Sequence, residues 1–284
     1  MPDPTLKPAS AQESPSWIRE RVLAAFAKAG FPEERILPPL APETDFDALR
    51  SVFAAVPPVR ILDVGGGTGA TALAMALAFP DARIIAVDVN APLPEMSAAG
   101  PADAEASPLG IAAAAARSLR AEGRIRFAAG VFAAHPAAGT GARVVGPDLC
   151  AEEGDFDLIL IGGSATAESR AADLRLAASA LSMRGLIATA GVMGPGGTGA
   201  RAGVSDFLRY NRDFFYIHPA IASARGSPGL LRHRSAGWFP GFEAPRPMRD
   251  ETPPDSVRER FADLAAVTLG ARPVLEIAVG APML

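Results

Sequence analysis

The chain has 284 residues, 49% of them hydrophobic and 20% charged, which allows a sizeable core and excludes a wholly disordered protein. Its 27 Lys and Arg residues against 31 Asp and Glu residues give a net charge of -4, which argues against a surface that binds nucleic acid. The single cysteine, Cys150, excludes a scaffold held together by internal disulfides.

A tail and a helical segment are expected ahead of the first strand. Residues 1–15 are rich in Pro, Ser and Ala without an apolar period, so the sequence predicts a disordered tail there. Residues 16–56 form the helical segment, with apolar residues at helical spacing over 16–29. A second, short helix is predicted over 45–54, with Thr44 as its N-cap.

Residues 57–235 alternate between short apolar runs and helical stretches, which indicates one α/β domain. An apolar run over 59–64, a glycine-rich turn, an Ala-rich helix over 70–79 and a second apolar run over 83–89 make a βαβ unit. The alternation predicts a doubly wound, mostly parallel, seven-stranded sheet with helices on both faces. The remaining strands are expected at 124–129, 157–161, 186–190, 214–222 and 230–234, and the remaining helices at 109–121, 168–181 and 200–210.

Other stretches interrupt or follow this alternation. Residues 91–108 and 135–154 are rich in Pro, Ala or Gly and are predicted to be loop insertions. Residues 236–284 are expected to be a Pro-rich linker and a C-terminal extension, with a helix over 257–269 and an extended piece over 273–279. Nothing in the sequence places this extension on the fold.

A glycine-rich turn follows the first predicted strand. It contains Gly65, Gly66, Gly67 and Gly69. Ligands of α/β sheets bind at the carboxyl ends of the strands, and glycines let a ligand approach the backbone closely. Asp88 ends the next strand, where its carboxylate can accept hydrogen bonds from both hydroxyls of a ribose. Together with Asp63 ahead of the turn, these residues predict a site for a nucleoside cofactor.

Two cofactor classes compete for this turn. Residues 65–70 also satisfy the G-x-G-x-x-G/A pattern of dinucleotide-binding proteins. Asp63 discriminates between the two, because its carboxylate would repel the pyrophosphate of a dinucleotide. The same carboxylate would attract the sulfonium and ammonium groups of S-adenosyl-L-methionine (SAM). The sequence therefore favours SAM.

The motif resembles that of the class I SAM-dependent methyltransferases, an acidic residue followed by x-G-x-G-x-G. It is matched by Asp63, Gly65, Gly67 and Gly69. The resemblance spans residues 59–235 and implies a Rossmann-like fold whose glycine turn surrounds the methionine part of SAM while Asp88 holds the ribose. Residues 203–208 and 229–231 resemble the subgroup that methylates sugars and other small hydroxylated metabolites.

This sequence departs from the family pattern at two places. The subgroup holds a divalent metal through carboxylates after the fourth and fifth strands, where this chain has Gly162, Gly163 and Ala190. A hard cation needs several oxygen ligands, so we expect no catalytic metal. Val131 stands where the family often has an acidic acceptor for the adenine amine. The alternatives left open for that role are Asp148, Glu152 and a backbone carbonyl.

A hydroxyl acceptor needs a base to remove its proton, and the chain has three histidines. His135 is favoured, because it follows the third strand at the expected cofactor end. His218 and His233 lie in or beside the last predicted strands. The candidate contacts to the acceptor are Tyr210, Tyr216 and Asp206.

The function expected from these observations is metal-independent, SAM-dependent O-methylation of a small hydroxylated metabolite. Two alternatives stay open: an NAD-dependent oxidoreductase and a non-catalytic, methyltransferase-like protein that binds SAM or acts as a scaffold. The sequence shows neither a signal peptide nor an apolar run near the ~20 residues that span a bilayer. We therefore expect a cytoplasmic protein with a small-molecule partner and neither nucleic acid nor membrane; a homodimer is left open.

Overall fold

The computed structural model describes residues 17–36, 43–89, 107–133, 143–163, 166–190, 198–220, 229–236 and 274–278. The tail predicted over 1–15 and the helix predicted over 257–269 lie outside these ranges. No helix in the described ranges is long and apolar enough to cross a membrane.

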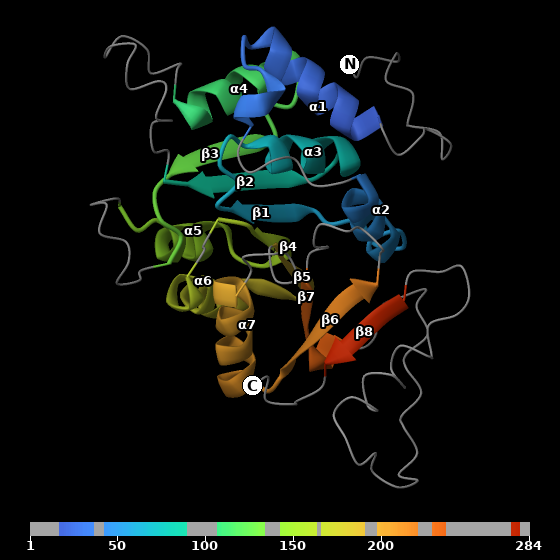
Figure 1. Cartoon of the computed structure of the whole chain (residues 1–284), viewed down its shortest axis with the longest axis vertical. Coiled ribbons are helices and arrows are strands. Elements are labelled where there is room, and N and C mark those ends of the chain that lie inside the picture. Colours follow the sequence, from blue (N-terminus) through green and yellow to red (C-terminus); the bar gives the residue numbers. More distant parts are fainter. Residues whose placement is uncertain are drawn as a thin grey trace, which may run out of the picture.

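One mixed sheet organises the chain, with the strand order β3-β2-β1-β4-β5-β7-β6-β8 (Figure 1). The strands from β3 to β5 are parallel, and β7, β6 and β8 are antiparallel to their neighbours. The predicted seven-stranded, mostly parallel sheet is confirmed for β1 to β7. The strands are β1 (Arg60–Val64), β2 (Arg83–Asp88), β3 (Ile125–Ala129), β4 (Phe156–Ile161), β5 (Leu181–Thr189), β6 (Phe214–Ala220), β7 (Gly229–His233) and β8 (Val274–Ala278).

Helices cover both faces of the sheet, as predicted. The helices α1, α3 and α4 lie together in the upper part of Figure 1, whereas α5, α6 and α7 lie at its lower left. The α-helices are α1 (Trp17–Lys28), α2 (Glu43–Val52), α3 (Ala70–Ala78), α4 (Pro108–Ser118), α5 (Gly146–Glu153), α6 (Ala167–Ser179) and α7 (Thr198–Tyr210). Short 3-10 turns occur at Glu33–Arg35 and Arg234–Ala236.

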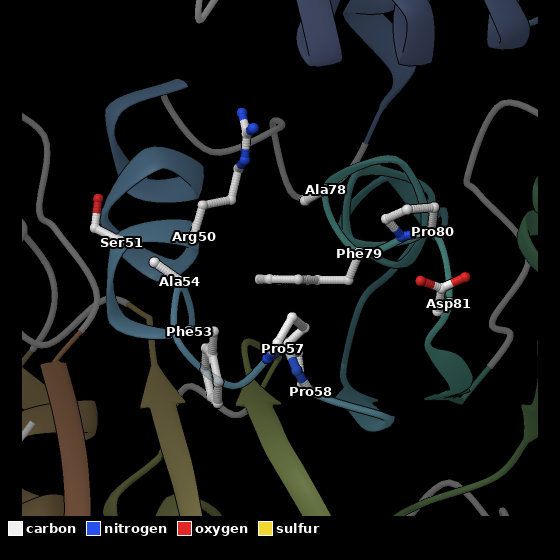
Figure 2. Close-up of a pocket in the computed structure, with 10 residues that line it drawn as sticks. All are labelled: Arg50, Ser51, Phe53, Ala54, Pro57, Pro58, Ala78, Phe79, Pro80 and Asp81. Atoms are coloured by element: carbon white, nitrogen blue, oxygen red, sulfur yellow. The ribbon is translucent and has the colours of Figure 1, made fainter. Parts of the chain in front are cut away.

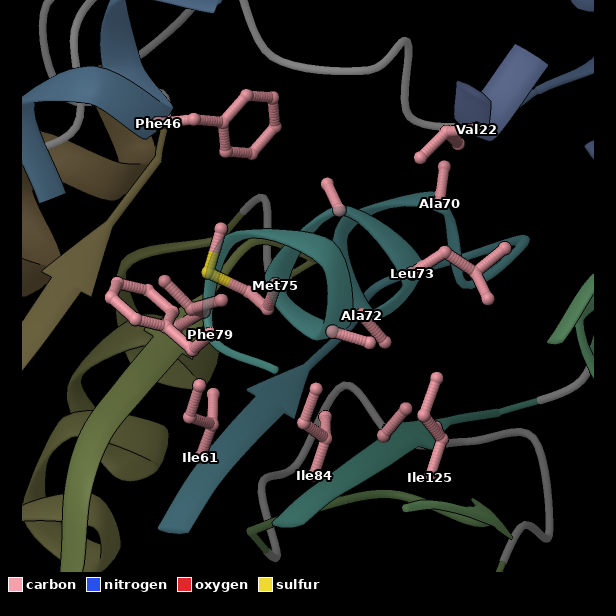
Figure 3. Close-up of a cluster of buried hydrophobic side chains, with 14 of the residues drawn as sticks. Val22, Phe46, Ile61, Ala70, Ala72, Leu73, Met75, Phe79, Ile84 and Ile125 are labelled. Carbon is pink, nitrogen blue, oxygen red and sulfur yellow. The ribbon is translucent and has the colours of Figure 1, made fainter. Parts of the chain in front are cut away.

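Alternate residues of the central strands belong to two separate hydrophobic clusters, one on each face of the sheet. On β1, Ile61 packs in the cluster beneath α3, whereas Leu62 and Val64 pack in the cluster beneath α6 and α7. A parallel strand that is buried on both faces needs this near-continuous apolar sequence. Figure 3 shows the first cluster, where Ile61, Ile84 and Ile125 point from the strands toward α3.

Four local predictions differ from the structure. The helix α2 begins at Glu43, so Thr44 lies inside it and is not the N-cap. The predicted loop 135–154 contains the helix α5, which begins at Gly146 despite the Gly and Ala content of this stretch. The strand β5 begins at Leu181, earlier than expected. The extended piece predicted over 273–279 is confirmed as β8, but its pairing with β6 adds an eighth strand to the predicted seven.

The turns that follow β1 and β4 are in direct contact. The Gly162 N–H donates to the Val64 carbonyl at 2.8 Å. Gly65 has a φ of +72°, and a Cβ added to it would lie 2.4 Å from the Cα of Gly163. A side chain at Gly65 would therefore have to displace the backbone of Gly163 and adopt a conformation that L residues avoid.

We expect Gly65→Ala to lower the free energy of unfolding by about 2 kcal/mol or more, because the clash and the left-handed conformation both add strain. Gly123→Ala is the matched control, since a Cβ at Gly123 would meet no described atom within 4 Å. Urea denaturation of both variants checks this. A Gly65→Ala protein as stable as the Gly123→Ala protein would contradict the expectation.

Candidate functional site

The glycine turn joins the carboxyl end of β1 to the start of α3. Gly65, Gly67 and Gly69 adopt φ values of +72°, +57° and +78°, a region that favours glycine. The Gly69 N–H donates to the Gly66 carbonyl at 2.9 Å, which closes the turn before α3 begins. The first N–H groups of α3 have no partner within the helix and give this end a partial positive charge.

Neighbouring atoms leave no space for a Cβ at Gly65, Gly66 or Gly69. A Cβ on Gly69 would lie 2.7 Å from the Cβ of Ala112 and 3.1 Å from the ring of Phe127. A Cβ on Gly66 would lie 2.4 Å from Oδ2 of Asp63. The sequence-predicted glycines and Asp63 are therefore brought together, with the carboxylate directly against the backbone of the turn.

Asp63 is a buried carboxylate with an incomplete set of hydrogen bonds. Its residue is 2% exposed, and its Oδ2 has no hydrogen-bond partner among the described residues. Burial, and then the neighbouring negative charge of Asp88, raise the pKa of the Asp63 carboxyl to about 7, while a hydrogen bond from the Ala72 N–H lowers it in part. A buried acceptor without a partner is costly, so this oxygen favours a ligand that brings a donor or a positive charge.

Asp88 lies at the end of β2, beside the same turn. Its Oδ2 accepts a hydrogen bond from the Gly67 N–H at 2.9 Å, and the backbone N–H of Gly65 donates to the Val87 carbonyl at 2.8 Å. The turn is thereby tied to β2 as well as to β1. Two neighbouring carboxylates make the site favourable for a cation and unfavourable for a pyrophosphate.

The position after β3 offers no carboxylate to an adenine amine. Val131 is 7% exposed and forms a parallel bridge with Val144. Both acidic alternatives from the sequence form exposed ion pairs: Asp148 with Arg143 at 3.0 Å, and Glu152 with Arg126 at 3.4 Å. A backbone carbonyl remains the third alternative of the sequence analysis.

A buried arginine lies beneath the ends of β4 and β5. Arg170 of α6 is 2% exposed and donates to the Ile161 carbonyl at 2.5 Å and to Oγ1 of Thr189 at 2.7 Å. Burial lowers the pKa of its guanidinium to about 10, against the opposing effect of the Asp173 carboxylate, so it is charged at neutral pH. Sequence reasoning missed Arg170 and Asp173. The available signal was their helical spacing with Leu174 and Ala177, which form the buried stripe of α6.

The candidate bases are not assembled at the turn by the described residues. His135 lies outside the described ranges, and the side chain of His218 is not described. His233 ends β7, which runs antiparallel to β5, so it lies at the edge of the sheet opposite to the glycine turn. There its Nδ1 lies 2.5 Å from Oγ of Ser235.

The three residues predicted to contact the acceptor are exposed, paired with another residue or packed in the sheet. Tyr210 is 71% exposed on α7, and Asp206 forms an ion pair with Arg175 of α6 at 2.5 Å. Tyr216 is buried in β6, and its ring fills the space beside Gly229, where a Cβ would lie 2.3 Å from it. Of the three, Tyr216 approaches the carboxyl edge of the sheet, because Gly229 pairs with Thr189 at the end of β5.

A cavity of about 570 Å³ lies at the opposite edge of the sheet (Figure 2). It is lined by residues of α2, by the segment before β1 and by the turn between α3 and β2, with Phe53 and Phe79 on its walls. Because these segments lead into the parallel strands, the cavity is at their amino ends. Pro57 and Pro58 add further apolar lining, and the geometry that could hold a cofactor is at the glycine turn instead.

Neither a protein-family model nor a curated protein matches this chain. Among solved structures, the cofactor-bound Rv0187 protein from MTB is 15% identical, with a TM-score of 0.50 over 78% of this chain and 91% of that chain. A caffeoyl-CoA O-methyltransferase candidate from Staphylococcus aureus is 13% identical, with a TM-score of 0.50 over 78% of this chain and 92% of that chain. At such identities the likeness concerns the fold: the chain shares a Rossmann-like, methyltransferase-type fold with these structures.

Proposed function

We propose that this protein is a SAM-dependent methyltransferase that methylates a hydroxyl group of a small metabolite. The observation that carries the proposal is the buried Asp63 carboxylate beneath the glycine turn, with Oδ2 unpartnered among the described residues. A dinucleotide would place a pyrophosphate against two carboxylates, which Coulomb repulsion opposes. SAM would place positive groups there instead.

The residues of the turn fit the groups that SAM carries. Asp63 would attract the ammonium or sulfonium group, and the glycines would let the methionine part lie against the backbone. Asp88 would accept hydrogen bonds from the ribose. When bound, SAM supplies a methyl group on a positively charged sulfur, and the turn would orient it toward the acceptor.

We further propose that the transfer does not require a metal. Gly162, Gly163 and Ala190 follow β4 and β5, and none of these side chains can ligate a hard cation. The positive charge of Arg170 lies beneath the same strand ends, where it would oppose the binding of a divalent cation. His135 remains the proposed base, and the proposed acceptor is a small molecule.

A second candidate is a protein that binds SAM without transferring its methyl group. Two observations favour it. Asp148 and Glu152 pair with arginines instead of facing a free site for an adenine amine, and Val131, which cannot accept a hydrogen bond through its side chain, is buried after β3. Incubation with labelled SAM and a library of hydroxylated metabolites separates the candidates. Binding without any labelled product would support the non-catalytic protein.

We expect the wild-type protein to bind SAM with a micromolar dissociation constant and Asp63→Asn to weaken binding by roughly tenfold, because the charge is lost while the shape is kept. Isothermal titration calorimetry measures both. Asp148→Asn is the matched control, since that carboxylate pairs with Arg143 on the surface, and it should not change the affinity. Tight binding of NAD with no binding of SAM would contradict the proposal.

The raised pKa of Asp63 also predicts a pH dependence of stability in the ligand-free protein. The carboxyl group has a pKa of about 7 in the folded state and an ordinary value of 3.8. Between these values the folded state binds more protons than the unfolded state, so stability falls as the pH rises from about 4 to about 7.

Relative to Asp63→Asn, which cannot ionise, the wild type should lose up to about 4 kcal/mol of unfolding free energy across this range. Urea denaturation of both proteins at several pH values checks this. Parallel pH profiles for the two proteins would show that Asp63 is not held in a raised-pKa environment.

A further inference from the structure

Two polar side chains of α6 reach the ends of β4 and β5 and the segment after β3. Arg170 Nη1 donates to the carbonyl of Ile161, the last residue of β4, and to the hydroxyl of Thr189, the last residue of β5. Its Nη2 lies 3.4 Å from the Gly162 carbonyl. One planar guanidinium therefore spans the ends of two neighbouring parallel strands, a geometry that its fixed fork of donors allows.

Asp173 extends this arrangement to the segment after β3. Its Oδ1 accepts a hydrogen bond from the backbone N–H of Ala133 at 3.2 Å, and its charge acts on the buried guanidinium of Arg170. Asp173 is itself 5% exposed. The two residues lie three apart on α6, so their side chains leave the same face of the helix toward the sheet.

The neighbouring helix leaves space for the arginine. A Cβ on Gly203 of α7 would lie 2.6 Å from Cβ and 2.9 Å from Cγ of Arg170. Glycine within a helix costs about 1 kcal/mol relative to alanine. A Cβ there would also lie 2.7 Å from the Ala167 carbonyl oxygen, so the glycine permits the close approach of α7 to the part of α6 that carries Arg170.

The end of β4, which Arg170 holds, leads directly into the residues that contact the glycine turn. Gly162, whose carbonyl faces Nη2, donates its N–H to the Val64 carbonyl just before the turn. Gly163 packs against Gly65, where no Cβ would fit. A displacement of the β4 end would therefore be transmitted directly to the backbone that borders Asp63.

We propose that Arg170 and Asp173 are positioning residues that fix the ends of β4 and β5 and the segment after β3, and so hold the glycine turn in its ligand-binding shape. Neither residue touches the ligand in this proposal. The inference rests on the proposed function only for the identity of the ligand, because the contacts among the strand ends are independent of it.

The test compares Arg170→Met, Arg170→Lys and Thr189→Val with Arg124→Met. Arg124 is the matched control, because it also donates to two backbone carbonyls, those of Ala76 at 3.1 Å and Phe79 at 3.5 Å. Its contacts lie at the end of α3 that is remote from the turn. Both methionine variants lose a partly or fully buried guanidinium and should lower the melting temperature.

Two measurements are made on each protein. Hydrogen exchange of the ligand-free protein follows the amides of Gly65 and Gly162, and calorimetry gives the dissociation constant for SAM. Arg170→Met should speed exchange at both amides by roughly tenfold and weaken SAM binding by a similar factor. Arg170→Lys and Thr189→Val should show smaller effects of the same kind, whereas Arg124→Met should leave both amides and the affinity within about twofold.

The outcomes separate the two proposals. If Arg170→Met does not fold, Arg170→Lys and Thr189→Val decide the question by the same measurements. Unchanged exchange at Gly65 and Gly162 together with unchanged SAM affinity would overturn the positioning role. If the wild type does not bind SAM, the proposed function fails, and the exchange rates alone confirm or overturn the positioning of the turn.

Discussion

The candidate site depends on the buried carboxyl group of Asp63, which is held against the backbone of a tight turn. Asp63 lies on a strand that is covered on both sides, and it faces a turn in which neighbouring atoms leave no room for a Cβ at Gly65, Gly66 or Gly69. The nearby carboxylate of Asp88 adds to the cost of ionising it. A fold would not keep such an arrangement for stability, because a neutral or apolar residue would be cheaper to bury. The arrangement favours a ligand that brings positive charge, as we propose for SAM.

The rest of the architecture keeps this turn in place. Hydrogen bonds tie it to β2 through Gly65 and Gly67, and the contact of Gly65 with Gly163 ties it to β4. On the other face of the sheet, the buried guanidinium of Arg170 holds the ends of β4 and β5. The carboxyl group of Asp63 and the guanidinium of Arg170 therefore lie at the ends of two neighbouring strands, β1 and β4, and the sheet holds them in place.

Much of the fold was predictable because its signals are local. Continuous apolar runs such as β4 identify strands that are buried on both faces, and the glycine turn beside Asp63 identifies the cofactor edge. The remaining features depend on tertiary contacts. The helix α5 was not predicted because the stretch around it is rich in Gly and Ala. The pairing of β8 with β6 was not predicted because it joins segments that are far apart in the sequence. Arg170 was missed because a charged residue on a helix is usually solvated, and only packing shows that this one is buried.

The most direct test of the account is a crystal structure of the protein grown with saturating S-adenosylhomocysteine, the product that keeps the ammonium group of SAM. We predict that the amino-acid part of this ligand lies over the turn from Gly65 to Gly67, with a donor hydrogen-bonded to the carboxylate of Asp63. The account would be contradicted by a structure in which the ligand binds elsewhere. It would equally be contradicted if the turn held a pyrophosphate, or if protein or water groups alone satisfied Asp63.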